Sequence, residues 1–191
     1  MVKWDTLWPG GLTFAFDDGP FKPSTDTFLL GGFAAPRPRD RVCDLGAGIG
    51  LLGLLLLGRQ PSIRVTDIDI DPAACALAEE SFAQNGLTGH TVLRADLRRR
   101  QELPPAGSFD MVVSNPPYFA ADSGAVAAGQ RGAARSEVTC TLAELCGAAS
   151  YLLRSGGQLC LVYRAARLAE LMALLRSYKL EPKELQTVQK T

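Results

Sequence analysis

The residues of this chain best placed to do chemistry are one acid and three alternating glycines, in the pattern Asp44-x-Gly46-x-Gly48-x-Gly50. They lie between a short apolar run, which is typical of a buried strand, and a leucine-rich run, which is typical of a helix. Glycines let the chain turn sharply and let a ligand approach with no Cβ in the way. The first N–H groups of the helix point into the same space. The pattern therefore predicts a loop that binds a nucleotide-like cofactor.

The glycines can be aligned with a ligand motif in two ways. Gly48-x-Gly50-x-x-Gly53 matches the dinucleotide fingerprint of NAD-binding proteins. In that fingerprint the first glycine leaves the strand directly, but here Asp44 and Gly46 precede it. The other alignment begins at Asp44 itself. A third interpretation, a strand-to-helix turn without a ligand, stays open on the glycines alone.

Two further acids come at the ends of the next two predicted strands. Asp69 ends the strand 63–69 and lies where a carboxylate can accept hydrogen bonds from the hydroxyls of a ribose. Asp71 precedes Pro72 and is expected to cap the following helix. Asp96 follows the strand 91–94, where the amino group of an adenine would need an acceptor.

A proline-rich tetrapeptide, Asn115-Pro116-Pro117-Tyr118, follows the predicted strand 108–114. The prolines fix an extended turn that has no spare N–H groups. Asn115 is therefore expected to be held rigidly at the end of its strand. As a bare tetrapeptide the run would prove little, so its place in the fold matters.

The elements that must position these residues alternate between strands and helices. This alternation predicts an α/β fold with a mostly parallel, doubly wound sheet. We expect an irregular N-terminal lead over residues 1–23, with one short strand at 13–16, followed by a single domain over 24–191. The remaining expected elements are helices at 24–32, 72–85, 141–153 and 165–178, and strands at 42–45, 158–163 and, as a sixth, 183–188.

Composition excludes several classes of protein. Lys and Arg number 20 and Asp and Glu number 20, so any contact with RNA must use a local patch. The five cysteines show no C-x-x-C pair, which favours reduced thiols, no metal site and a cytoplasmic protein. The longest apolar run, Leu51–Leu57, is too short to cross a membrane. The single histidine, His90, is expected to be solvated, which leaves few candidates for a general base.

The glycine loop after the first strand and the Asn-Pro-Pro-Tyr run after the fourth together resemble the class I S-adenosylmethionine-dependent methyltransferases that modify a conjugated or amide nitrogen. Such a nitrogen is a poor nucleophile because its lone pair is delocalised. The resemblance implies that the Asn115 side-chain oxygen and the Pro116 carbonyl accept its hydrogens and aim the lone pair at the methyl group. It also implies that Tyr118 stacks on the substrate ring.

Within that class, the chain resembles the bacterial tRNA adenine-N6 methyltransferases that modify the purine beside the anticodon of a valine tRNA. The resemblance runs from about residue 14 to 189 and includes Ser24-Thr25-Asp26-Thr27-x-Leu29-Leu30, Arg131-x-x-Ala134-Arg135-x-Glu137 and Leu142-x-x-Leu145. It implies that Asp26 and Thr27 close over the cofactor and that the arginine segment lies near the substrate. Ser136 stands where the family commonly has histidine. The C-terminal hairpin of the class is expected to be incomplete.

The sequence thus predicts a Rossmann-like N-methyltransferase that uses S-adenosylmethionine and acts on tRNA, as a monomer or weak dimer without a metal or a membrane. Its expected cofactor contacts are Asp26, Thr27, Asp44, Gly46, Gly48, Gly50, Asp69, Asp96 and Asn115, and its expected RNA contacts are Tyr118, Arg98, Arg99, Arg100, Arg131 and Arg135. The alternatives are an rRNA guanine-N2 methyltransferase, an inactive cofactor-binding module and a protein-glutamine methyltransferase. The last normally has a separate N-terminal helical domain.

Overall fold

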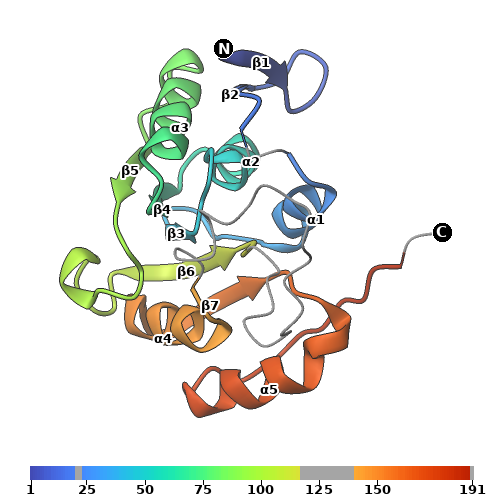
Figure 1. The fold of residues 1–191 in the computed structure, drawn as a ribbon, viewed down its shortest axis with the longest axis vertical. Coiled ribbons are helices and arrows are strands. Elements are labelled where there is room, and N and C mark those ends of the chain that lie inside the picture. The colour runs from blue at the N-terminus through green and yellow to red at the C-terminus, as the bar shows by residue number, and fades with distance from the viewer. Residues whose placement is uncertain (20–22, 117–139, 190–191) are drawn as a thin grey trace, which may run out of the picture.

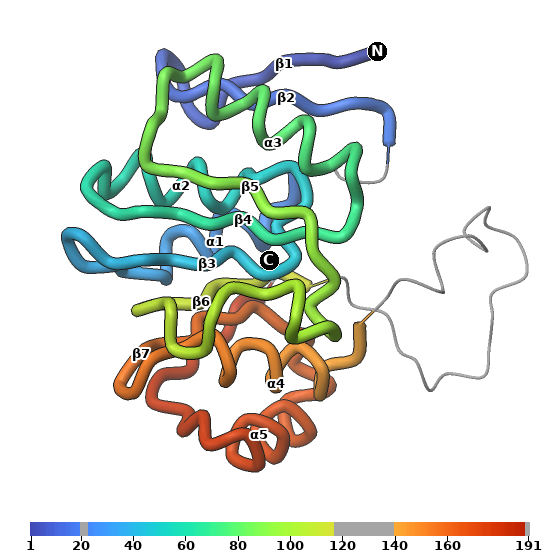
Figure 2. The backbone as a smooth tube through the Cα atoms, turned by 90° about the vertical axis from the view of Figure 1, so that its left-hand side faces the viewer, coloured from blue at the N-terminus to red at the C-terminus, as the bar shows by residue number. Residues whose placement is uncertain are grey.

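The computed structural model describes residues 1–19, 23–116 and 140–189 (Figure 1). At its centre lies a five-stranded sheet with the strand order β5-β4-β3-β6-β7, in which every neighbouring pair is parallel. Figure 2 shows these strands one below another in that order. They are β3 (Arg41–Leu45), β4 (Arg64–Asp69), β5 (His90–Arg94), β6 (Phe109–Ser114) and β7 (Leu153–Leu161). The α/β fold with a parallel, doubly wound sheet is confirmed.

Helices cover both faces of the sheet because successive residues of a strand point to opposite sides. Val42 of β3 belongs to a core shared with the first three helices, whereas Cys43 belongs to a second core shared with the last two. In Figure 1, α4 and α5 lie toward the bottom of the view, near β7, and α2 and α3 lie toward the top, near β4 and β5. The helices are α1 (Thr25–Phe33), α2 (Leu51–Arg59), α3 (Pro72–Gln84), α4 (Leu142–Leu152) and α5 (Leu168–Ser177), with short 3-10 turns at Arg100–Glu102 and Ala165–Arg167.

The N-terminal residues were expected to be irregular apart from one short strand, but they form a β-hairpin. The strand expected at 13–16 is present as β2 (Thr13–Phe16), and it pairs antiparallel with β1 (Lys3–Thr6), which the sequence analysis did not predict. The hairpin is attached to α3 by hydrogen bonds: Ala15 N donates to Ser81 Oγ at 2.8 Å, and Thr13 N donates to Asn85 Oδ1 at 2.9 Å. It therefore extends the core over α3.

The C-terminal part departs from expectation in two ways. β7 starts at Leu153, five residues earlier than expected, and its pairing with β6 shifts register between Phe109 and Met111. The expected sixth strand at 183–188 is absent, so that prediction was wrong. The two largest apolar side chains of this segment, Leu185 and Val188, are each 61% exposed. With no apolar face buried, the segment gains too little to offset the entropy of ordering a strand.

Within the described part of the chain, no helix is both long enough and apolar enough to cross a membrane.

Candidate active site

The two sequence motifs meet at the carboxyl edge of the sheet, where β3 and β6 lie side by side. The buried Ser114 hydroxyl at the end of β6 donates to the carbonyl of Leu45 at the end of β3, at 2.6 Å. Asn115 follows Ser114 at the end of β6, and Gly46 follows Leu45 at the end of β3. The strand order reverses between β3 and β6, and in open α/β sheets ligands bind at such a point. The site is therefore centred on these two residues.

The glycine loop is held in a left-handed backbone conformation, with φ of 79° at Gly46, 56° at Gly48 and 74° at Gly50. A Cβ added at Gly46 would meet no atom within 4 Å, so this glycine borders open space. A Cβ at Gly50 would instead lie 2.9 Å from both Ala78 Cβ and Asp67 Oδ2. Gly46 therefore keeps room for a ligand, whereas Gly50 allows α2 to approach the strands and α3 closely.

Asp69 connects the end of β4 to the glycine loop. Its Oδ2 accepts a hydrogen bond from Gly48 N at 2.7 Å, and its Oδ1 accepts one from Asp71 N at 2.9 Å. Burial raises the pKa of Asp69, and these two N–H donors act in the opposite direction. A carboxylate can accept about four hydrogen bonds, so both oxygens retain lone pairs for a further donor. Asp71 caps α3, as predicted, by accepting from Ala73 N at 2.8 Å.

Asp44 lies beneath the loop beside a second acid that the sequence analysis did not select. Asp44 and Asp67 are paired residues of β3 and β4, and both are buried. Among the described residues, Asp44 Oδ2 and both Asp67 side-chain oxygens have no hydrogen-bond partner. Burial, followed by repulsion from Asp69, raises the pKa of Asp44 to about 8. Burial and repulsion from Asp44 also raise the pKa of Asp67.

A pattern in β4 could have identified Asp67. It is two residues beyond Val65, which faces the core, and two residues before Asp69, so all three lie on one face of the strand. An acid on a buried face requires an explanation, because an isolated carboxylate is costly to bury.

Asn115 is anchored to the start of α1. Its Nδ2 donates to Thr27 Oγ1 at 2.9 Å and to Ser24 Oγ at 3.2 Å. The structure thus brings Thr27 to Asn115, and Asp26 lies beside Thr27 in the first turn of α1. Pro116 is buried next to Asn115. Three of the residues expected in the site, Tyr118, Arg131 and Arg135, lie outside the described residues.

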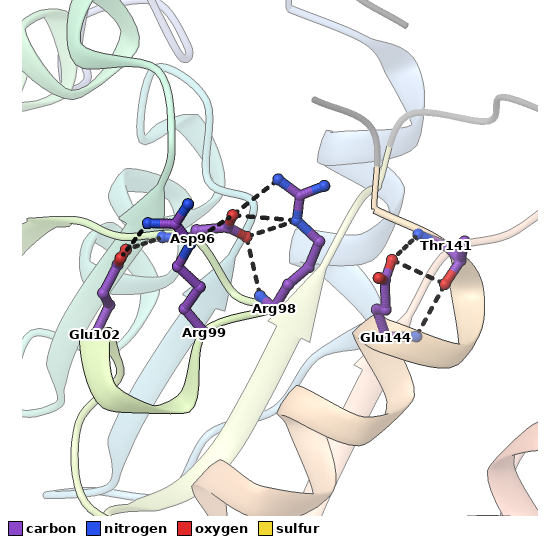
Figure 3. Close-up of polar contacts among 6 residues, drawn as sticks. All are labelled: Asp96, Arg98, Arg99, Glu102, Thr141 and Glu144. Atoms are coloured by element: carbon purple, nitrogen blue, oxygen red, sulfur yellow. Dashed lines mark hydrogen bonds and ion pairs between the residues drawn. The ribbon is translucent and has the colours of Figure 1, made fainter. Parts of the chain in front are cut away.

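The expected RNA patch at 98–100 makes contacts within the chain. Arg98 binds the Asp96 carboxylate, with Nε to Oδ1 and Nη2 to Oδ2 both at 2.8 Å, while Arg99 Nη1 contacts Glu102 Oε1 at 3.0 Å (Figure 3). The guanidinium of Arg100 lies 5.2 Å from the centre of the Tyr151 ring. Hydrogen bonds from Arg98 hold the pKa of Asp96 below its ordinary value. Asp96 is therefore ionised and fixed in place at the end of β5.

Neither the histidine nor the cysteines add chemistry to the site. His90 stacks on Phe82 with ring centres 4.0 Å apart and its Nδ1 lies 3.1 Å from the Leu87 carbonyl, so the ring is half-buried and packed rather than merely solvated as expected. Burial lowers the pKa of His90. All five cysteines are free thiols. No group of three or more potential metal ligands occurs among the residues that the structure describes.

The arrangement defines a class of protein: a Rossmann-like methyltransferase fold. The structure superposes on that of a predicted O-methyltransferase from Agrobacterium tumefaciens with a TM-score of 0.64 and 26% sequence identity, over 80% of this chain and 68% of the other. It also matches TrmN from Thermus thermophilus with a TM-score of 0.55 and 25% identity, over 82% of this chain and 40% of that protein.

Sequence comparison gives the family. The model of the methyltransferase small domain matches residues 24–180, and the chain belongs to this family. The chain is 34% identical over 171 residues to the tRNA1(Val) (adenine(37)-N6)-methyltransferase of Porphyromonas gingivalis, covering 86% of this chain and 67% of that enzyme. It is 33% identical over 168 residues to the enzyme of the same name from Parabacteroides distasonis, covering 87% and 69%. The family and the fold imply the use of S-adenosylmethionine.

Proposed function

We propose that this protein transfers a methyl group from S-adenosylmethionine to N6 of an adenosine beside the anticodon of a tRNA in the cytoplasm. The observation that carries the chemistry is the position of Asn115, which follows β6 and lies next to the glycine loop of β3 through the Ser114–Leu45 hydrogen bond. The choice of substrate is supported by relatives that are named for adenine 37 of a valine tRNA and are similar over most of this chain.

The residues at the carboxyl ends of three neighbouring strands fit the cofactor. Gly46 after β3 leaves an open space that a Cβ would enter, and Asp69 at the end of β4 can accept from ribose hydroxyls. Asp96 after β5 is an ionised acceptor for an adenine amino group. Asp44 would support the loop from below. Bound here, S-adenosylmethionine would supply an electrophilic methyl group on its sulfonium.

The chain's own contribution to the reaction would be made by acceptors. Asn115 Oδ1 and the Pro116 carbonyl would accept the two hydrogens of the adenine amino group, which draws its nitrogen toward tetrahedral geometry and frees its lone pair. No strong base is required, because the amino group becomes acidic once it carries the methyl group. This agrees with a chain whose one histidine is packed against Phe82.

Incubation with labelled S-adenosylmethionine and unfractionated tRNA, followed by mass spectrometry of the nucleosides, tests this proposal. We expect N6-methyladenosine, and sequencing of the labelled tRNA should locate it beside the anticodon. In parallel incubations with rRNA and with cell protein, methylated guanosine or methylated glutamine would assign the same fold to a different substrate. Cofactor binding without transfer to any of these substrates would indicate an inactive binding module.

Asp69→Ala should weaken the binding of S-adenosylmethionine. The variant loses a charge-assisted acceptor, which is worth about 1.5–3 kcal/mol, or roughly 10–150-fold in Kd. It also releases Gly48 N from its hydrogen bond. Isothermal titration calorimetry measures the change. Asp71→Asn, which keeps an oxygen for the cap of α3, is the matched control and should bind normally. Unaltered affinity in Asp69→Ala would show that the ribose lies elsewhere.

The arginines should differ in their effect on tRNA binding. Arg131→Gln with Arg135→Gln should reduce the slope of log affinity against log salt by about 0.7–0.9 for each phosphate that is no longer neutralised. Arg98→Gln should leave the slope nearly unchanged, because the Arg98 charge is already balanced by Asp96. Filter binding at several salt concentrations measures both. The opposite ranking would place the phosphate-binding side chains beside β5.

A further inference from the structure

We propose that Ser24 and Thr27 are positioning residues that set the orientation of the Asn115 amide, so that its nitrogen faces α1 and its oxygen is turned toward the substrate. This inference deepens the proposed function. It rests on that function for the identity of the substrate amino group, which donates its hydrogens to the Asn115 oxygen. The resemblance assigned Thr27 to the cofactor, whereas the sequence pattern offered Ser24 or Thr25 only as the cap of the helix at 24–32. The contacts of both hydroxyl groups point to Asn115 instead.

Counting hydrogens decides which way the amide is turned. The three side chains make a triangle: Ser24 Oγ lies 3.1 Å from Thr27 Oγ1, and the amide of Asn115 lies 3.2 Å and 2.9 Å from them. If the amide oxygen faced the hydroxyls, two hydroxyl hydrogens would have to serve three contacts. If Nδ2 faces them, its two hydrogens and one hydroxyl hydrogen serve all three. The second arrangement leaves no contact unsatisfied, so it is strongly favoured.

The hydroxyl groups are themselves held in place by the anchoring of α1. Ser24 caps the helix by accepting from Thr27 N, which fixes the distance between the two side chains. At the other end, Arg59 of α2 donates to the carbonyls of Gly31 and Ala34, which no longer have partners within the helix. A Cβ at Gly31 would lie 3.2 Å from Leu55, so α1 and α2 pack closely. α1 is therefore held at its start by the Ser24 cap and at its end by Arg59, so the two hydroxyl groups have fixed positions.

The orientation matters because a planar amide presents either two donors or two lone pairs to a neighbour. A substrate amino group brings hydrogens, and it is stabilised only by the oxygen side. A reversed amide would place donors against donors. Ser24 and Thr27 thus act through Asn115, and they would reduce the cost of orienting it during the reaction.

Thr27→Val tests the inference, since it removes the hydroxyl, nearly keeps the shape and leaves the Ser24 cap intact. We expect kcat on tRNA to fall about tenfold, less than the 10²-fold that a misplaced catalytic group costs. The Kd for S-adenosylmethionine should change by less than about twofold. Thr27→Ser, which restores a hydroxyl, should recover most of the activity. Thr25→Val, an exposed replacement of the same kind in the same turn, should behave as wild type.

A double-mutant cycle separates action through Asn115 from direct action on the cofactor. In an Asn115→Ala background, Thr27→Val should cause no further loss of kcat. A loss that persists in that background, or that occurs as a raised Kd for S-adenosylmethionine, would overturn the inference and return Thr27 to the cofactor.

A second measurement needs no substrate, and so distinguishes failure of this inference from failure of the proposed function. In the ¹⁵N NMR spectrum, the Asn115 side-chain amide is identified by its absence from Asn115→Ala. Both of its hydrogens should exchange slowly with water in the wild type and at least tenfold faster in Thr27→Val. Fast exchange in the wild type contradicts the inference even if tRNA is methylated. Slow exchange in a protein that methylates no RNA would retain the positioning and reject the proposed substrate.

Discussion

Replacement of Asn115 by alanine is expected to lower kcat on tRNA by about 10²–10³, the range for removing one preorganised polar group that stabilises a transition state. The side chain lies at the end of β6, and its amide nitrogen is bound by Ser24 and Thr27. Its oxygen would thus meet the substrate without having to be ordered first. Cofactor affinity should change little, because the glycine loop follows β3 and Asp69 ends β4.

Two measurements check this prediction. Single-turnover methylation of tRNA gives the rate of the chemical step, and calorimetry gives the Kd for S-adenosylmethionine. Asn85→Ala is a useful control, since Asn85 also uses a side-chain amide to join distant segments but lies at the end of α3 beside the hairpin. It should reduce stability while leaving the rate per folded molecule unchanged. Full turnover in Asn115→Ala would mean that the Asn-Pro-Pro-Tyr tetrapeptide is only a proline-rich turn without a catalytic role.

The sheet and the glycine loop could be predicted because their signals are local. Apolar runs of strand length, each ended by an acid or by Asn115, gave the four strands that carry the site. The caps of the helices were equally local: Asp71 was expected to cap α3 and does so, and Ser24, one of two candidates with Thr25, caps α1. Such features depend on residues within a few positions of one another, so a pattern in the sequence is enough to identify them.

The parts that were missed depend on residues far apart in the chain. β1 is stabilised by pairing with β2, and the hairpin that they form is hydrogen-bonded to α3, 66 residues further along the chain. The segment 183–188 lacks a strand because a strand pattern needs a neighbour to pair with and a core to cover. Arg98 is an expected RNA contact, and its pairing with Asp96 through three charge-assisted hydrogen bonds was not predicted. Charged side chains in a run do not reveal which of them have partners.

The same limit applied within the site. Thr27 and Asn115 are 88 residues apart in the sequence, and no pattern in either segment indicates that their side chains meet. Sequence resemblance placed both residues near the cofactor. The structure adds that the two side chains are joined by a hydrogen bond, and the proposed positioning role changes what a substitution at Thr27 is expected to do.

The buried acids Asp44 and Asp67 should make the protein lose stability as pH rises. Both carboxyl groups are paired residues of neighbouring strands, and Gly53 of α2 lies against both: it donates a backbone hydrogen bond to Asp44, and a Cβ there would meet Asp67 Oδ1 at 2.6 Å. Asp69 faces them and raises both pKa values further. The Cys43 thiol, beside them in β3, has its own pKa raised by burial and stays protonated.

The sign follows from the direction of these shifts. In the unfolded chain both acids titrate near 3.8, whereas in the folded protein the pKa of Asp44 is about 8 and that of Asp67 is also raised. Between about pH 4 and pH 8 the folded state therefore holds protons that the unfolded state has released. The free energy of unfolding should fall by about 1.4 kcal/mol per pH unit for each proton retained. Asp96 and Asp110, whose pKa values are lowered by arginines, act only below this range.

Asp67→Asn should make that dependence shallower by about 1.4 kcal/mol per pH unit, since asparagine keeps the shape and does not titrate. Relative to wild type, the variant should thus become more stable as the pH rises above about 4. Urea unfolding at several pH values measures the change. Glu79→Gln removes an exposed carboxylate from the adjacent helix α3 and should leave the slope as in wild type. An equal slope in wild type and Asp67→Asn would mean that Asp67 is ionised in the folded protein, and that a cation or a donor balances its charge beneath the glycine loop.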